Sequence, residues 1–284
     1  MPPRLSPIRR FLLWWMRHPN SPHVSANFAV EFTGARAYLE RINGEEGPRV
    51  SVNHLFAAAV GRTFIEFPGA NARVLGNTIR RERHVGVAAP VNLLDTATGA
   101  TRELSMMVLP KVDQLSLRDI AARSRTIVAS EREGKVQNPL TRIMMAAATY
   151  APQRVLDRSF DATWSLLSNP LMGPITARAL PVTVAISNPG SAFAEIEGLR
   201  FRGAAINLPG PGWCVGSLFG LTPVQDEVVV VNGAPAVRPV LPVMFVFDHR
   251  LIDGVMAGKV MKRLSGILQD PEAAFGPHGR RAGA

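Results

Sequence analysis

The chain has 284 residues, 46% of them hydrophobic, and its 32 basic and 22 acidic side chains give a net charge of +10 at pH 7. This length and apolar content suit a folded protein with a sizeable core and exclude a disordered chain. The single cysteine, Cys214, excludes an internal disulfide and suits a reducing compartment, so we expect a cytoplasmic protein.

The positive charge comes almost entirely from arginines that are spread along the sequence. A nucleic-acid-binding protein usually shows a recognisable module or basic residues interleaved with aromatic ones, and neither is present. We therefore predict no nucleic-acid partner. A basic surface would still attract a smaller polyanion by long-range electrostatics.

Residues 1–22 form an N-terminal arm in which Arg9, Arg10 and Arg17 flank the apolar run 11–16. Six apolar residues are too few to span a bilayer or to form a signal-peptide core. Two interpretations stay open. Trp14 and Trp15 can touch a membrane surface, or the arm can pack on its own domain or on a neighbouring subunit.

The first half of the chain after the arm alternates short strands with amphipathic helices. Strands are predicted at residues 26–32, 71–75, 84–93 and 103–109, and helices at 33–44, 51–67 and 116–134. Ser51 or Asn53 can cap the second of these helices, and Ser116 with Asp119 forms a capping box for the third.

The second half begins with two helical patches, near 140–150 and 154–167, which a Pro/Gly-rich stretch follows. Strands are predicted at 182–187, 213–219, 227–231 and 238–247, with Asn232-Gly233 as a hairpin turn, and a helix at 255–268. Mixed strands and helices that cover a sheet face predict one α/β domain, a two-layer sandwich with a mixed sheet, at 23–275. We expect a flexible tail at 276–284.

The segment Phe-Asp-His-Arg-Leu-Ile-Asp-Gly, residues 247–254, joins the last predicted strand to the last helix. It places His249 and Asp253 on a loop that a rigid scaffold would hold. Histidine is the side chain best suited to take and return a proton near neutral pH. His249 is therefore our candidate general base, against the alternative of a loop histidine that only makes structural hydrogen bonds.

The pattern Asp-His-Arg-x-x-Asp-Gly at 248–254 resembles the active-site signature of the dihydrolipoamide acyltransferase cores of 2-oxoacid dehydrogenase complexes. Its shorter form, His-x-x-x-Asp-Gly, is shared with chloramphenicol acetyltransferase. Further stretches that look like this family follow in the expected order, at residues 51–60, 66–71, 132–135 and 186–190.

The resemblance implies a chloramphenicol acetyltransferase-like fold and acyl transfer between a coenzyme A thioester and a thiol, hydroxyl or amine acceptor. It implies that His249 removes the acceptor proton, with its tautomer fixed by a backbone carbonyl, and that Ser187 supports the oxyanion. It also implies that Asp253 helps to hold the histidine loop, through Arg250, Arg9 or Arg10.

Each of these residues also has a structural interpretation. Ser187 begins Ser-Asn-Pro-Gly, a strong turn sequence in any protein, and Pro189 stands where the family usually has leucine. Asp253 can cap the final helix, and Asp248 and Arg250 are expected to be structural. No histidine shows metal-ligand spacing with cysteine or carboxylate, so no metal site is predicted.

The family also implies a homotrimer with the active site between subunits, and assembly into cages. Residues 136–180 depart from its pattern as an insertion, which can supply extra core, an oligomer contact or a lid over an apolar acceptor pocket. This sequence shows no lipoyl-attachment segment, so we expect no covalent lipoyl group on it and a lipoyl-bearing partner or a small acceptor instead. The competing hypothesis is a non-catalytic trimeric assembly protein that keeps the fold.

Overall fold

The computed structural model describes residues 22–75, 78–94, 101–133, 139–189, 201–203 and 215–283. The predictions for the N-terminal arm, Cys214 and Gly190 lie outside these residues. No helix in the described ranges is long and apolar enough to cross a membrane.

The described strands are β1 (His23–Glu31), β2 (Ala72–Leu75), β3 (Thr78–Arg81), β4 (Val87–Leu94), β5 (Thr101–Leu109), β6 (Val184–Ser187), β7 (Ser217–Leu221), β8 (Gln225–Val231) and β9 (Ala234–Asp248). Seven of them form one sheet in the order β1-β9-β7-β6-β4-β5, with β8 paired to β9, and β2 and β3 form a separate hairpin. The pairs β4–β6 and β6–β7 are parallel and the others are antiparallel. The prediction of a mixed sheet is confirmed.

The helices that follow the predicted apolar periodicity are α2 (Thr33–Asn43), α3 (Val52–Glu66), α4 (Leu117–Arg132) and α8 (Gly254–Gln269). The insertion contains α5 (Pro139–Tyr150), α6 (Gln153–Leu167), the 3-10 turn η2 (Pro170–Met172) and α7 (Gly173–Ala179). The 3-10 turn η1 (Val112–Gln114) and the short helix α9 (Pro271–Phe275) complete the described elements. The elements η1, η2, α7 and α9 were not predicted.

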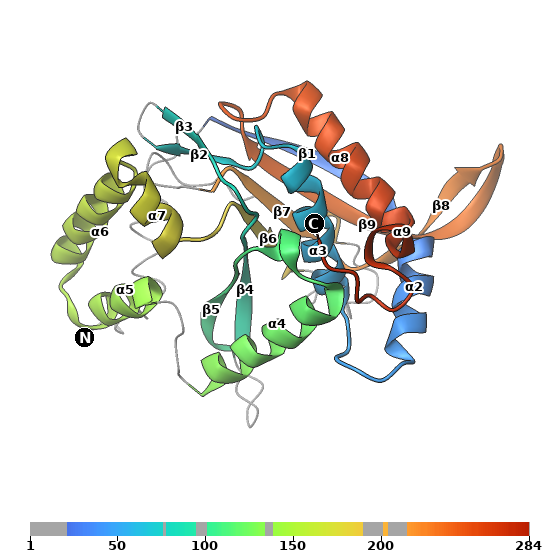
Figure 1. Ribbon diagram of the computed structural model, residues 1–284, viewed down its shortest axis with the longest axis horizontal. Helices are drawn as coiled ribbons and strands as arrows, with labels where there is room; N and C mark the ends of the chain where they lie inside the picture. Colours follow the sequence, from blue (N-terminus) through green and yellow to red (C-terminus); the bar gives the residue numbers. More distant parts are fainter. Residues whose placement is uncertain are drawn as a thin grey trace.

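The main core lies between one face of the sheet and α2, α3, α4 and α8 (Figure 1). Phe219 of β7 stacks on Phe245 of β9 at 4.5 Å between ring centroids, and Phe56 of α3 meets Phe219 edge-on at 5.3 Å. Because side chains alternate along a strand, Leu218, Met244 and Val246 form a second, smaller cluster on the opposite face. The sheet is therefore apolar on both faces around β7 and β9.

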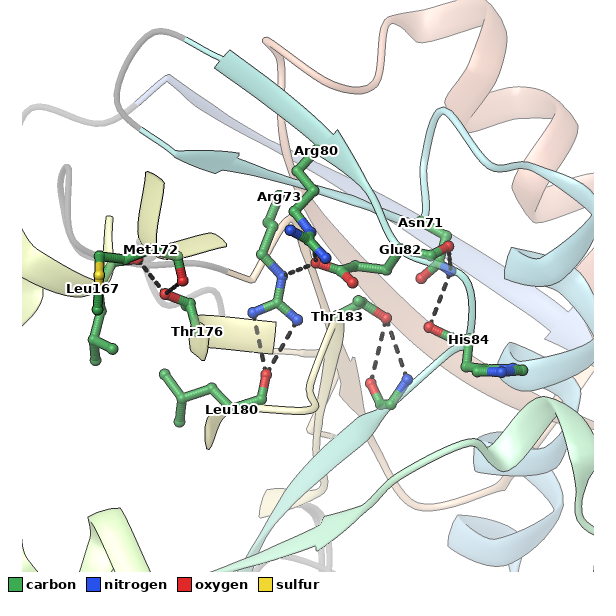
Figure 2. Close-up of polar contacts among 11 residues, drawn as sticks. Asn71, Arg73, Arg80, Glu82, His84, Leu167, Met172, Thr176, Leu180 and Thr183 are labelled. Atoms are coloured by element: carbon green, nitrogen blue, oxygen red, sulfur yellow. Dashed lines mark hydrogen bonds and ion pairs between the residues drawn. The ribbon is translucent and has the colours of Figure 1, made fainter. Parts of the chain in front are cut away.

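The insertion lies beside the β2–β3 hairpin, on the other side of the molecule from the projecting β8–β9 hairpin (Figure 1). The buried guanidinium of Arg73 on β2 fastens it, since both terminal nitrogens donate to the carbonyl oxygen of Leu180 at 3.1 Å (Figure 2). The Nε of Arg73 lies 2.7 Å from a carboxylate oxygen of Glu82. Gly86 allows the chain just after the insertion to pack closely, because a Cβ at residue 86 would overlap the carbonyl group of Pro181.

The prediction of a flexible tail after Phe275 is wrong for the described residues. The carbonyl oxygen of Gly276 accepts from the Tyr38 hydroxyl at 2.8 Å, and that of His278 accepts from Arg118 at 3.3 Å. Arg62 donates to the carbonyl of Arg281 at 3.1 Å. A tyrosine on α2 and arginines on α3 and α4 therefore hold this segment on the domain, an interaction that local sequence does not reveal.

Candidate active site

The loop that carries His249 is held by the residue before it. Asp248, the last residue of β9, is 4% exposed, and its carboxylate accepts from the backbone N–H of Arg250 at 2.9 Å. The same carboxylate accepts from the Arg250 guanidinium at 2.6 and 3.0 Å. The ion pair raises the pKa of Arg250. Asp248 and Arg250 are thus structural, as predicted.

Backbone contacts complete the loop. The carbonyl oxygen of Asp248 accepts from the N–H groups of Leu251 and Ile252, and the N–H of His249 donates to the carbonyl of Pro22 at 2.9 Å. Ile252 is fully buried and packs in the main core. These contacts fix the backbone of His249 while its side chain remains exposed. Among the described residues, no side chain or carbonyl hydrogen-bonds its imidazole.

Asp253 serves as the N-cap of α8. Its Oδ1 accepts from the backbone N–H of Met256 at 2.7 Å, in the extended backbone conformation that N-caps adopt. The expectation that Arg250 reaches Asp253 is wrong, because Arg250 is committed to Asp248. Arg9 and Arg10 lie outside the described residues. Asp253 therefore positions the start of α8, directly after the histidine loop.

His23 is a residue of this region that sequence reasoning passed over. It begins β1 opposite Asp248 in the β1–β9 pairing, and its buried Nδ1 has no hydrogen-bond partner among the described residues. Burial lowers the pKa of His23, Asp248 opposes this effect, and Arg250 adds to it. Only the strand pairing brings His23 here, so the local sequence gave no usable signal.

Ser187 ends β6 and is half-buried, at the other end of the sheet from His249. The register pairs Ser187 with Gly220, and Gly220 with Met244, five positions before His249 along β9. At roughly 3.3 Å per residue and 4.8 Å per strand spacing, Ser187 and His249 of one chain are about 20 Å apart. One chain does not bring the predicted base and oxyanion donor together.

A pocket of about 530 Å³ opens near the Ser187 end of the sheet. Asn188, the residue after Ser187, donates to Asn53 in the first turn of α3 at 2.7 Å, and the start of α3 forms part of the pocket wall. Arg36, Arg49 and Ser51 line the pocket together with apolar side chains such as Phe32 and Val224. The described residues contain no group of three or more His, Cys, Asp or Glu that could hold a metal ion.

A family model, the catalytic domain of the 2-oxoacid dehydrogenases acyltransferase family, matches residues 4–139 and 182–276. The chain belongs to this family. The unmatched stretch between the two segments contains α5, α6 and α7, which is the insertion predicted from the sequence. The predictions of the family and of an acyltransferase catalytic domain are confirmed.

Longer relatives are similar to this chain at low sequence identity. The succinyltransferase component of the 2-oxoglutarate dehydrogenase complex of Bartonella vinsonii is 22% identical over 84% of this chain and 44% of its own length. The lipoamide acyltransferase component of the branched-chain alpha-keto acid dehydrogenase complex of Bacillus subtilis is 23% identical over 87% of this chain and 47% of its own. The chain thus spans less than half the length of these relatives.

Solved structures confirm the fold. The cubic core of a pyruvate dehydrogenase multienzyme complex superposes with a TM-score of 0.63 at 20% identity, covering 94% of this chain and 88% of its own. A probable dihydrolipoamide acetyltransferase from Listeria monocytogenes gives a TM-score of 0.65 at 18% identity, covering 95% and 94%. A chloramphenicol acetyltransferase gives 0.50 at 16% identity, covering 93% and 96%. The predicted chloramphenicol acetyltransferase-like fold is confirmed.

Proposed function

We propose that this chain transfers an acyl group between coenzyme A and a thiol, hydroxyl or amine acceptor, with His249 as the general base. The observation that supports this proposal is the structure of the loop around His249. Asp248, Arg250 and Pro22 hold its backbone, while the imidazole stays exposed and free of partners among the described residues. A general base needs this combination of a fixed position and an available nitrogen.

In the proposed reaction, His249 takes the proton of the acceptor as the acceptor atom bonds to the thioester carbonyl carbon. The carbonyl oxygen becomes an oxyanion, which the hydroxyl of Ser187 stabilises by a hydrogen bond. Collapse of this intermediate breaks the carbon–sulfur bond, and the departing thiolate of coenzyme A receives the proton from His249. The base is restored and no acyl-enzyme forms.

Because Ser187 and His249 of one chain are about 20 Å apart by strand geometry, the site that we propose combines residues of two chains. We therefore propose a homotrimer with sites at its interfaces. The β8–β9 hairpin supports self-association, since Val228, Val230 and Val237 are exposed on it and Val228 pairs with Val237. The fold relative that forms a cubic core supports further assembly.

The pocket near Ser187 is the proposed place for coenzyme A. Arg49 and Arg36, which also pairs with Asp226, place positive charge for phosphate groups beside the carboxylate of Glu40, and the apolar lining suits the rest of a cofactor-sized ligand. The names of the relatives support dihydrolipoamide as acceptor, delivered by a lipoyl group. We further propose a cytoplasmic location, which the single cysteine supports.

The His249 loop also has support in a solved relative. Crystallographic and enzymatic work on the Azotobacter vinelandii dihydrolipoamide acetyltransferase investigated the role of a serine, a histidine and an asparagine in its catalytic mechanism, the last two being four positions apart. His249 and Asp253 have this spacing, and Ser187 is the proposed serine. Aspartate in place of asparagine keeps the helix cap that the structure shows.

The test compares wild type with His249→Ala in acyl transfer from acetyl-CoA and succinyl-CoA to dihydrolipoamide, with free coenzyme A measured by chromatography. We expect kcat to fall about 10²- to 10⁴-fold, the usual contribution of general acid–base catalysis. His278→Ala is the matched control, because His278 is an exposed histidine of the tail that bonds Glu45 far along the chain. A panel of alcohols and amines would identify another acceptor.

The alternative, a non-catalytic assembly protein, draws on the long distance between Ser187 and His249 within one chain. An inactive protein would give no turnover with any acyl donor or acceptor, and His249→Ala would then change neither activity nor assembly. Unchanged transfer in His249→Ala would equally rule out the proposed mechanism.

A further inference from the structure

The insertion carries an unusual amount of exposed apolar surface. Tyr150 at the end of α5 is 86% exposed and Leu171 in η2 is 88% exposed. Four more large apolar side chains of the same region are over half exposed, namely Ile143, Val155, Leu166 and Ile175. So many exposed apolar side chains in one region make it a candidate interaction surface.

The apolar residues of α6 share their face with arginines. At about 100° per residue, Arg154, Arg158, Val155 and Leu166 fall within an arc of roughly 120° on the helix. Leu156, Phe160 and Leu167 fall on the opposite side, where they are buried. Basic and apolar side chains on one solvent-facing side of a helix are typical of helices that lie in a membrane interface.

The exposed Asp161 lies at the edge of this face, about 20° around the helix from Arg154, so the face carries two basic residues and one acidic residue. Arg154, Arg158 and Arg178 are exposed and form no ion pair with any described residue. The insertion as a whole contains four arginines against two aspartates. Its exposed surface is therefore both apolar and cationic, which favours an anionic partner.

The positive charge of the exposed face of the insertion distinguishes between its candidate partners. A second copy of this chain would bring the same arginines and a net charge of +10 against this face. The chain's own residues 1–21 contain four arginines and no acidic residue, so they would also meet it with like charge. A bilayer with anionic lipids offers phosphates for the arginines and an apolar interior for the leucines, isoleucines and tyrosine.

We infer that the exposed face of α5, α6 and α7 binds an anionic membrane surface. The side chains of Leu166 and Leu171 enter the interface, and Arg154 and Arg158 contact lipid phosphates. The site is pre-formed, because Ala148, Leu156 and Phe160 give the insertion a small core of its own. The buried Arg73 ties it to the β2–β3 hairpin, so membrane binding would orient the whole domain (Figure 2).

The test is flotation of the full chain with vesicles of phosphatidylcholine plus phosphatidylglycerol, compared with phosphatidylcholine alone. We expect binding only to the anionic vesicles, and less of it at high salt. The double variant Leu166→Ser/Leu171→Ser should bind at least about tenfold more weakly, since it removes two apolar anchors. Arg154→Gln/Arg158→Gln should also bind at least about tenfold more weakly. Val255→Ser, which removes an exposed valine from α8, should bind like wild type.

Three outcomes would overturn the inference. One is equal flotation of wild type and the leucine double variant. The second is loss of binding on deletion of residues 1–21 with no effect of the leucine variant, which would make the arm the only anchor. The third is a change of mass in the leucine variant by analytical ultracentrifugation, with no vesicle binding by wild type, which would make this face a contact between copies.

Discussion

Asp248 and Asp253 lie five positions apart in the candidate active-site loop and have different structural roles. Asp248 is buried and holds the guanidinium and the backbone N–H of Arg250, so it shapes the loop itself. Asp253 is exposed and caps α8. The sequence motif contains both carboxylates without indicating which of them pairs with the arginine.

The cap makes a testable prediction at the scale of one residue. Asp253→Ala should lower the free energy of unfolding by about 1 kcal/mol, because the N–H of Met256 loses its acceptor. Asp253→Asn should leave it nearly unchanged, because asparagine caps helices about as well as aspartate. Urea unfolding measures both. A large loss in Asp253→Asn would show that the negative charge itself stabilises the loop.

At the scale of elements, α3 begins with a capping box built on a histidine. The N–H of Ser51 donates to Nδ1 of His54 at 3.1 Å, and the N–H of His54 donates to the Ser51 hydroxyl. Nδ1 can accept only when it carries no proton. Burial lowers the pKa of His54 to about 4, and the charge of Arg125 adds to the effect.

This box predicts a pH dependence of stability. Above the unfolded-state pKa of about 6.5, His54 is neutral in both states and its full contribution is present. As the pH falls towards 4, His54 binds a proton in the unfolded chain but not in the folded chain. The free energy of unfolding therefore falls by up to about 3 kcal/mol. His54→Gln, which keeps an acceptor that does not titrate, should reduce this loss in urea unfolding between pH 7 and 4.5. An unchanged slope would assign the pH dependence to other groups.

The contacts of Arg73 with the insertion lead to a second prediction at the scale of helices and strands. Arg73→Met should lower the free energy of unfolding by about 3 kcal/mol, because it removes a buried guanidinium from the Glu82 carboxylate and the Leu180 carbonyl, which keep, among the described residues, only Arg80 and the backbone N–H of Val182. It should also open residues 139–180 to protease. Arg80→Met is the matched control, since Arg80 also faces Glu82 but is partly exposed and should cost less than about 1 kcal/mol. Equal effects of the two variants would contradict the anchoring role of Arg73.

At the scale of the whole molecule, the proposed two-chain active site predicts complementation. His249→Ala and Ser187→Ala should each be impaired alone. If the two are co-expressed and mix at random in a trimer, about a quarter of the interfaces would combine an intact His249 with an intact Ser187. Acyl transfer by the mixture measures this directly, with size and mass checked by light scattering. No recovery in proven mixed trimers would place both residues in one chain's site.

Much of the fold could be predicted because helix faces are a local property. Val260, Leu264 and Leu268 recur at helical spacing in the last predicted helix, and all three are buried in the structure. The Ser116 capping box and the Asn232-Gly233 turn, with positive φ at both residues, are present as predicted. Short-range periodicity and turn chemistry do not depend on distant residues.

The sequence by itself determined the family, the motif around His249 and the place of the insertion, since these depend on residues next to one another in the chain. Only the tertiary structure decided that Arg250 pairs with Asp248, that the tail is packed, and that Ser187 and His249 of one chain lie at opposite ends of the sheet. Those outcomes depend on strand register and on long side chains that reach across the fold. Such contacts join residues far apart in the chain, so no local pattern contains them.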